Sequence, residues 1–435
     1  MSDPGNIIQL PRPKAARSAA SEMGLFIRVG RNDHRTMLDL IAEGEKRFFG
    51  LVIDAPHTHR HRVLRAEARK REIDVILDPK TQPLATFGGH THTLGELPWA
   101  DATRPHRLDD FSGDNGRDLA SMIVDHATAN GYTQILGPTH FLQDHTDPWL
   151  HTDVAAMAHM KRRIEAAQAD IELIYPLSLP IEILREPAYR AAVVHALKDA
   201  PYDALWLKVD NFGADASGEK TVAYIEACRD FHSLGVPVIA DHVGGLPGLG
   251  LLAFGAVGGI AHGITLYEGF RSYSWRKPPQ QSNSAWTQPV RVYLQRLDMH
   301  LTRADAQTLF NASQRIKARF GCTDTHCCSG IKGQLERPAR HFIHQRSREV
   351  SDISNMPDSL RASGYLDKNV RSASDDVALL CSTDALPNEM REKFQKKQAA
   401  LGRFRGSLAN LVEAERLGSA AKPPERLPER RKTHA

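Results

Sequence analysis

The sequence has no long hydrophobic run and few cysteines. No apolar stretch approaches the roughly 20 residues that a membrane-crossing helix needs, so we expect no membrane association. Residues 1–22 carry Arg, Lys and Ser without a hydrophobic core, which excludes a secretory signal and is typical of a disordered leader. Five cysteines, an odd number, argue against a disulfide framework and favour a reducing, cytoplasmic compartment.

Neither sign of charge is in large excess. The 56 basic residues exceed the 52 acidic ones by only four, and 41% of the chain is hydrophobic. This composition is typical of an ordinary globular protein. The mildly basic balance permits a phosphate-bearing partner without requiring one.

Short runs rich in Val, Ile and Leu recur along the first 265 residues, with helical stretches between most of them. Such runs are what strands buried on both faces of a parallel sheet need. Eight of them predict a closed (β/α)8 TIM barrel, a fold that places its chemistry at the C-terminal ends of the strands. The runs cover 24–30, 48–56, 73–79, 133–141, 171–179, 204–212, 236–245 and 258–265.

The rest of the chain suggests an appendage after the barrel. We expect a barrel over 23–320, with a helix over 289–320, and a zinc-binding, helical appendage over 321–416. Residues 417–435 are basic and rich in Pro, Glu and Arg, which is typical of a disordered tail.

The strand ends carry polar residues that the strand bodies lack. Asp241 and Asp78 each end a buried run and are candidate catalytic carboxylates, although an Asp in that position can also cap the next helix. Gly244 and Gly245 follow Asp241 and permit close approach of the backbone to a ligand. The other candidates at the ends of runs are Arg31, Asp54, His140, Tyr175, His242 and His262, with Asp54, His140 and His242 as substrate-binding residues and His262 as catalytic.

Lys208 is the residue hardest to explain structurally, because it lies in the apolar run of 204–212. A buried lysine is costly unless its charge is paired or its pKa falls. Asp210, two residues on, lies on the same strand face and is a candidate partner. The run is the sixth, where class I aldolases carry their Schiff-base lysine, so a lysine-dependent lyase is one alternative.

Three of the five cysteines lie within seven residues, as Cys322, Cys327 and Cys328. Three Cys and one His form a standard structural zinc site. Three nearby histidines are candidates for the fourth ligand, and we favour His344 over His341 and His326.

At these residues the chain resembles the tRNA-guanine transglycosylase family, which joins a (β/α)8 barrel to a late zinc subdomain of three Cys and one His. The second point of similarity is the passage 236–264, with its glycine-ended strand, short helix and following strand. The cysteine spacing C-x4-C-C differs from the family's C-x-C-x-x-C. The resemblance implies base exchange at an N-glycosidic bond of tRNA or DNA, with a free base as the small-molecule partner.

Base exchange needs a carboxylate nucleophile and a second acid or base, and we assign these roles to Asp241 and Asp78. Basic residues around the cysteines and in the loop before them are candidate phosphate contacts. They are Arg271, Arg276, Lys277, Lys332, Arg337, Arg340, Arg346 and Arg348. Two further readings remain: a barrel that binds nucleic acid without catalysis, and a metal-dependent amidohydrolase using His90 and His92. The sequence leaves the oligomeric state open.

Overall fold

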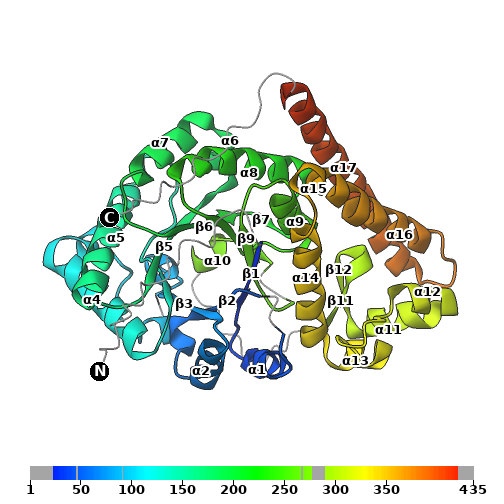
Figure 1. Cartoon of the computed structure of the whole chain (residues 1–435), viewed down its shortest axis with the longest axis horizontal. Helices are drawn as coiled ribbons and strands as arrows, with labels where there is room; N and C mark the ends of the chain where they lie inside the picture. Colours follow the sequence, from blue (N-terminus) through cyan, green and yellow to red (C-terminus); the bar gives the residue numbers. More distant parts are fainter. Residues whose placement is uncertain (1–22, 46–47, 91, 266–267, 277–289, 420–435) are drawn as a thin grey trace, which may run out of the picture.

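The computed structural model describes residues 23–45, 48–90, 92–265, 268–276 and 290–419. Eight parallel strands close into a barrel in the order β1-β2-β3-β4-β5-β6-β8-β9 (Figure 1). Each strand coincides with one of the eight predicted runs, with β5 ending one residue beyond its run, so the TIM-barrel prediction is confirmed. The strands are β1 (Gly24–Arg28), β2 (Gly50–Asp54), β3 (Asp74–Asp78), β4 (Gln134–Leu136), β5 (Glu172–Pro180), β6 (Ala204–Asp210), β8 (Val238–Asp241) and β9 (Gly259–Gly263).

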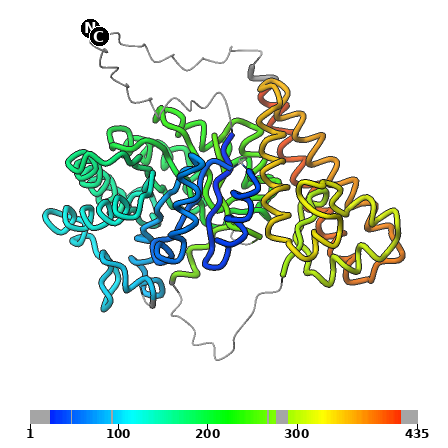
Figure 2. The backbone as a smooth tube through the Cα atoms, turned by 60° about the horizontal axis from the view of Figure 1, so that its bottom comes forward, coloured from blue at the N-terminus to red at the C-terminus, as the bar shows by residue number. Residues whose placement is uncertain are grey.

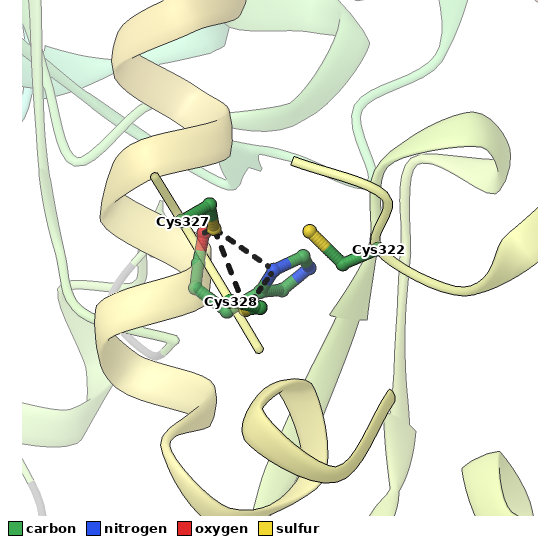
Figure 3. A group of neighbouring side chains, drawn as sticks. Cys322, Cys327 and Cys328 are labelled. Atoms are coloured by element: carbon green, nitrogen blue, oxygen red, sulfur yellow. Dashed lines mark hydrogen bonds between the residues drawn. The ribbon is translucent and has the colours of Figure 1, made fainter. Parts of the chain in front are cut away.

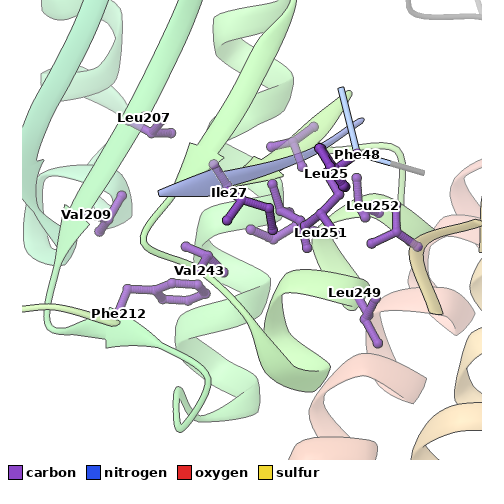
Figure 4. Close-up of a cluster of buried hydrophobic side chains, with 14 of the residues drawn as sticks. Leu25, Ile27, Phe48, Leu207, Val209, Phe212, Val243, Leu249, Leu251 and Leu252 are labelled. Atoms are coloured by element: carbon purple, nitrogen blue, oxygen red, sulfur yellow. The ribbon is translucent and has the colours of Figure 1, made fainter. Parts of the chain in front are cut away.

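Helices between these strands form the outer ring. The residues that pack strand against helix make a large apolar core, part of which is drawn in Figure 4, where Leu25 and Ile27 of β1 lie beside Leu251 and Leu252. The ring helices are α1 (His34–Ala42), α2 (Arg62–Lys70), α4 (Gly113–Ala129), α5 (Trp149–Ala166), α7 (Pro187–Leu197), α8 (Gly218–Phe231) and α9 (Gly245–Ala253), with the shorter α3 (Thr81–Leu84) and α6 (Ile181–Arg185) beside them.

The inside of the barrel is filled by one apolar layer, with a side chain from every strand. Because side chains alternate along a strand, residues two positions beyond this layer face inward at the C-terminal end. Arg28, Asp54, Asp78, Lys208 and Asp241 occupy those positions. The layer consists of Phe26, Val52, Ile76, Leu136, Ile174, Trp206, Ile239 and Ala261.

The helix that completes the outer ring, between α9 and α1, comes from far along the sequence. Helix α14 (Pro338–Ser354) packs against α9, α1 and β1, and its other side meets β11 (Arg291–Leu294) (Figure 1). The segment from β11 to α13 therefore forms an insertion beside the barrel, which Figure 2 shows next to the C-terminal helices.

The insertion contains a β-hairpin where the sequence suggested only helix. Strands β11 and β12 (Met299–Thr302) pair antiparallel, so the helix prediction over 289–320 is wrong for this part. Val292, Tyr293 and Leu294 are all buried, so both faces of β11 are covered. Asp298 adopts a positive φ of 43° in the turn. Helices follow from Arg303: α11 (Arg303–Ala312), α12 (Gln314–Phe320) and α13 (Gly330–Glu336).

The chain ends in helices that cover the insertion and one flank of the barrel. Helix α17 (Asn388–Ser419) packs against α16 (Ser372–Cys381) and α8, and α15 (Asp358–Tyr365) packs against α9. The predicted leader at 1–22 and residues 420–435 of the predicted tail lie outside the described residues. Helix α17 extends through Ser419, so the tail prediction is wrong for residues 417–419. No helix within the described part of the chain has the length and apolar character needed to cross a membrane.

A two-stranded ribbon lies over the C-terminal end of the barrel. It pairs β7 (Phe212–Gly213), which follows β6, with β10 (Gly269–Phe270), which follows β9. The short helix α10 (Tyr273–Arg276) follows and carries Trp275. Asp210 holds this segment, since the backbone N–H and the hydroxyl of Ser272 both donate to its carboxylate, at 2.6 and 3.0 Å.

Candidate functional site

The barrel mouth is organised around Arg28. Its Nε and Nη2 donate to the two carboxylate oxygens of Asp241, both at 2.6 Å, and its Nη1 donates to Asp78 Oδ2 at 2.8 Å. Asp54 Oδ1 lies 3.5 Å from the same Nη1. One guanidinium thus joins three strand-end carboxylates, all of which the sequence analysis singled out.

Burial acts to raise the pKa values of these carboxyls, but the cations around them outweigh it. Arg28 and Lys208 hold the pKa of Asp241 well below its usual range. The pKa of Asp78 is lowered in the same way, by Lys80, Arg28 and Lys208. Both carboxylates are ionised at neutral pH. The Asp241 side chain has no exposed surface, and Arg28 binds both of its oxygens.

Lys208 lies in the same charged group, on the sixth barrel strand. Its Nζ donates to Gln82 Oε1 at 2.8 Å and lies 3.8 Å from Asp241 Oδ2. The rings of Phe270 and Trp275 lie over it, with centroids 5.5 and 5.8 Å from Nζ. The expected pairing with Asp210 is wrong, because Asp210 accepts hydrogen bonds from Ser272 instead.

The pKa of Lys208 is lowered to about 8. Burial is the main cause, and the nearby cations Arg28 and Lys80 add to it, while Asp241 and Asp78 act in the opposite direction. A lysine with such a pKa has a substantial neutral fraction near physiological pH, and the neutral amine is the nucleophilic form.

A small pocket opens beside this amine. It holds about 10 Å³, room for roughly one water molecule, and Asp78, Thr81, Gln82 and Lys208 supply its polar lining. Leu136, Gly137 and Pro176 are among its other lining residues. Asp241 does not line it, so Lys208 and Asp78 are the charged groups that a small molecule in this pocket would meet.

His242 and the glycine pair follow β8, but only His242 belongs to the mouth. Its backbone N–H donates to Asp241 Oδ1 at 2.8 Å, its φ is 56°, and its ring lies 5.9 Å from that of Phe270. Burial is the main cause that lowers the pKa of His242 well below its usual value.

Gly244 and Gly245 leave space for the side chain of Glu268. The expectation that these glycines face a substrate is therefore wrong. A Cβ on Gly244 would lie 1.8 Å from Glu268 Oε1, and the N–H of Gly245, at φ 60°, donates to that oxygen at 3.2 Å. Glu268 in turn accepts from Arg346 Nη2 at 3.1 Å and interacts with His300 Nε2 at 2.8 Å. The glycines thus connect the segment after β8 to helix α14.

His262 does not face the mouth, so its predicted catalytic role is corrected. Ala261 points inward, and His262 therefore points outward, where its ring lies 5.4 Å from Phe342 of α14. Its Nδ1 lies 2.9 Å from Gly263 O. Burial lowers its pKa to about 4, so this imidazole is a neutral packing residue.

His140 is also placed outside the mouth, contrary to its predicted substrate-binding role. Its Nδ1 and backbone N–H lie 2.7 and 2.8 Å from the carboxylate oxygens of Asp153 on α5. The ring stacks on Trp149 at 3.6 Å and meets the edge of Phe111. The surrounding aromatic rings enclose it, and burial lowers its pKa to about 3.

Two other strand-end candidates are corrected. Arg31 is exposed, and its carbonyl accepts a hydrogen bond from Arg60. Arg28, three residues earlier, is the arginine that enters the mouth. Tyr175 is buried among the residues that pack outside the barrel, with its ring 5.5 Å from that of Tyr202.

The three clustered cysteines converge with a histidine from α14 (Figure 3). The Sγ atoms of Cys327 and Cys328 each lie 3.3 Å from His341 Nδ1 and 3.5 Å from one another. A tetrahedral zinc with Zn–S of about 2.3 Å and Zn–N of about 2.0 Å needs ligand atoms roughly 3.5–3.8 Å apart. All four ligand atoms, Cys322 Sγ included, lie within 4.8 Å of one another, so the group can hold a metal ion.

The fourth residue of this group is His341, which corrects the choice of His344. His341 Nε2 lies 3.1 Å from the carbonyl of Tyr293, an arrangement that keeps the proton on Nε2 and directs the Nδ1 lone pair at the sulfurs. His344, three residues further along α14, faces another direction, and its Nδ1 lies 2.9 Å from a carboxylate oxygen of Glu45. His326 is exposed and lies outside the group.

The basic residues proposed as phosphate contacts are distributed differently from the expectation of one surface. Arg346 is fully buried, between Glu268, Asp298 and Glu349. Arg340 pairs with Glu43. Lys277 lies outside the described residues. These positions therefore do not form a single basic face.

No protein-family model matches the sequence, and no curated relative matches it. Solved structures with a similar fold include a GH10 xylanase from Bispora sp. MEY-1, at 12% identity and a TM-score of 0.39, covering 57% of this chain and 84% of that one. An HpcH/HpaI aldolase from Desulfitobacterium hafniense DCB-2 has 11% identity and a TM-score of 0.33, with coverages of 58% and 90%. The carboxyl transferase domain of Rhizobium etli pyruvate carboxylase has 10% identity and a TM-score of 0.36, with coverages of 94% and 64%. At these values the likenesses support no inference about activity.

Proposed function

We propose that this protein is a barrel enzyme in which Lys208 forms an imine with the carbonyl carbon of a small polar substrate. The observation that carries the proposal is the position of Lys208 Nζ. It is buried, it lines the pocket at the mouth, and its pKa is lowered to about 8. A desolvated lysine beside other cations is the pattern by which proteins activate an amine as a nucleophile.

The chemistry requires few further groups. The neutral amine adds to the carbonyl carbon, and loss of one water leaves the imine. Protonation of the imine gives a cation, which the ionised carboxylates of Asp78 and Asp241 would stabilise at short range. Gln82 Oε1, 2.8 Å from Nζ, orients the amine. The pocket itself holds about one water, so the substrate's carbonyl would enter it while its remainder lies toward Phe270 and Trp275.

Borohydride trapping tests this proposal. The protein is incubated with a panel of small aldehydes and 2-oxo acids, reduced with sodium borohydride, digested and mapped by mass spectrometry. We expect a substrate-sized mass increase on Lys208 that is absent from the Lys208→Met variant. The exposed Lys317 serves as the control for non-specific labelling. Labelling of Lys317 alone contradicts the proposal.

A second candidate function is the N-glycosidic chemistry of the tRNA-guanine transglycosylase resemblance. The Cys3His group beside the barrel supports it, as does Asp78, which lines the mouth pocket. Asp241 is a poorer nucleophile than the sequence suggested, because Arg28 binds both of its oxygens. Nucleic acid would be the partner. Release or exchange of labelled guanine in tRNA or DNA that Asp78→Asn abolishes and Lys208→Met leaves intact would favour this function.

We further propose zinc as the ion at Cys322, Cys327, Cys328 and His341. Three thiolates and one imidazole are a standard structural set for zinc. Four protein ligands leave no open position for a substrate, so the ion would fasten the loop 321–329 to α14 and take no part in the reaction.

A further inference from the structure

A groove in the insertion opens beside the Cys3His group, away from the barrel mouth. Its volume is about 600 Å³, in the range of small-molecule sites. Its walls come from the 3₁₀ helix Gln295–Leu297, from α12, from the loop after α12, and from α13 and α14. In Figure 1, α12 and α13 lie on the side of α14 that faces away from the barrel strands.

One end of the groove is lined by two arginines that a buried carboxylate, Asp376, holds in position. Arg296 Nε donates to Asp376 Oδ2 at 2.7 Å, and Arg319 pairs with the other oxygen of the same carboxylate. Asp376 is fully buried, so it fixes the two guanidinium groups side by side. Each guanidinium has five N–H groups, and most of them remain available to a ligand.

A third arginine adds uncompensated charge at this end. Arg315 also lines the groove, and it forms no hydrogen bond or ion pair with any residue that the structure describes. The three arginines outnumber Asp376, the carboxylate that pairs with two of them, and so leave an excess of positive charge at this end. Paired guanidinium forks match the geometry of phosphate oxygens, and this arrangement costs little further ordering when an anion binds.

The other end of the groove has a different character. Arg348 lies 3.7 Å from Asp324 and 4.0 Å from Asp352, so its charge is compensated there. Carboxylates accept hydrogen bonds from hydroxyl or amino groups. The groove therefore presents an anion-binding end and an acceptor-rich end, and its size admits a molecule larger than free phosphate.

We propose that this groove binds a small phosphorylated ligand of nucleotide size. Arg296, Arg315 and Arg319 contact its phosphate groups, and Asp324 and Asp352 accept hydrogen bonds from its hydroxyl or amino groups. The site is separate from Lys208 and does not depend on the reaction at the barrel mouth.

Isothermal titration calorimetry of the full chain with ADP tests the site, and adenosine serves as the probe without phosphate. We expect ADP to bind and adenosine to bind at least tenfold more weakly. Arg315→Gln should weaken ADP binding about tenfold, since a charged hydrogen-bonding group is lost. Arg315 is exposed and unpaired, so this variant keeps the fold. Arg405→Gln, an exposed arginine on α17, is the matched control and should bind ADP as the wild type does.

Three results would overturn the proposal. The first is the absence of ADP binding to the wild-type protein. The second is ADP binding that Arg315→Gln and Arg319→Lys leave unchanged, which would place the nucleotide elsewhere. The third comes from a single-stranded 12-nucleotide DNA: binding that is much tighter than that of ADP and lost in Arg315→Gln would assign the groove to a nucleic-acid strand.

Discussion

Arg28 binds Asp241 through two hydrogen bonds of 2.6 Å, one to each carboxylate oxygen. A third hydrogen bond, of 2.8 Å, runs from the same guanidinium to Asp78. The Arg28–Asp241 pair joins β1 to β8 across the barrel mouth. These two strands are not neighbours in the barrel, because β9 lies between them. The charge of Arg28 and its hydrogen bonds keep Asp241 ionised although burial acts the other way. Because Arg28 covers Asp241, Lys208 and Asp78 are the charged groups that line the pocket.

Replacing Arg28 with Met should strongly destabilise the barrel. The change leaves Asp241 buried without its main partner, a situation that costs about 3–5 kcal/mol. Urea unfolding measures the loss. The double variant Arg28→Met/Asp241→Leu removes both charges and should be more stable than Arg28→Met alone. A double variant as unstable as the sum of both single changes would contradict this view of the pair.

The metal site predicts opposite behaviour for two histidines on one helix. His341→Ala should lower the metal content, measured by elemental analysis, from one ion per chain to well below one, because the imidazole in the Cys3His group is lost. His344→Ala is the matched control and should keep the ion, since its partner is Glu45. Loss of metal in His344→Ala but not in His341→Ala would show that His344 is the ligand.

Glu349 should make stability depend on pH. Burial raises its pKa to about 7, although the charge of Arg346 acts the other way. The folded protein then holds a proton that the unfolded chain has released between pH 4.5 and 7, so this group's stabilising contribution is present below about pH 4.5 and lost as the pH rises through 7. The change is roughly 1–3 kcal/mol.

Urea midpoints at pH 5 and pH 7.5 measure this dependence. Glu349→Gln should reduce the fall in stability between the two values, because the amide does not titrate. Glu336→Gln, at an exposed position, should leave the fall unchanged. An identical fall in wild type and Glu349→Gln would mean that Glu349 is ionised throughout this range.

The barrel was predictable because every strand is a continuous apolar run, a local signal that needs no knowledge of the partner strands. Asp54, Asp78, Lys208 and Asp241 were predictable for a related reason, since a polar residue at the end of such a run is conspicuous. Which face a strand-end residue points to depends on the register of the barrel. His262 was therefore assigned to the mouth although it faces α14.

Other residues depend on contacts between distant segments. Arg28 carries no local signal that separates it from Arg31, and it is identified only by the carboxylates of β3 and β8. The choice between His341 and His344 depends on the rotation of α14 about its axis, which packing against α9 and β11 sets. Glu268 belongs to a loop and carries no local sequence signal. Its contact with the segment after β8 is recognised only in the structure, where its carboxylate occupies the space that a side chain on Gly244 would fill.

The reactivity of Lys208 as a function of pH tests the proposed function most directly. Labelling with acetic anhydride between pH 6 and 11, followed by peptide mass mapping, reports the neutral fraction of this amine, and Lys317 gives the reagent's behaviour at an exposed lysine. Labelling of Lys208 that reaches half its maximum near pH 8 is the predicted result, because burial and the neighbouring cations lower its pKa to about 8. A midpoint above pH 10, or no labelling at any pH, would contradict an activated lysine at the barrel mouth.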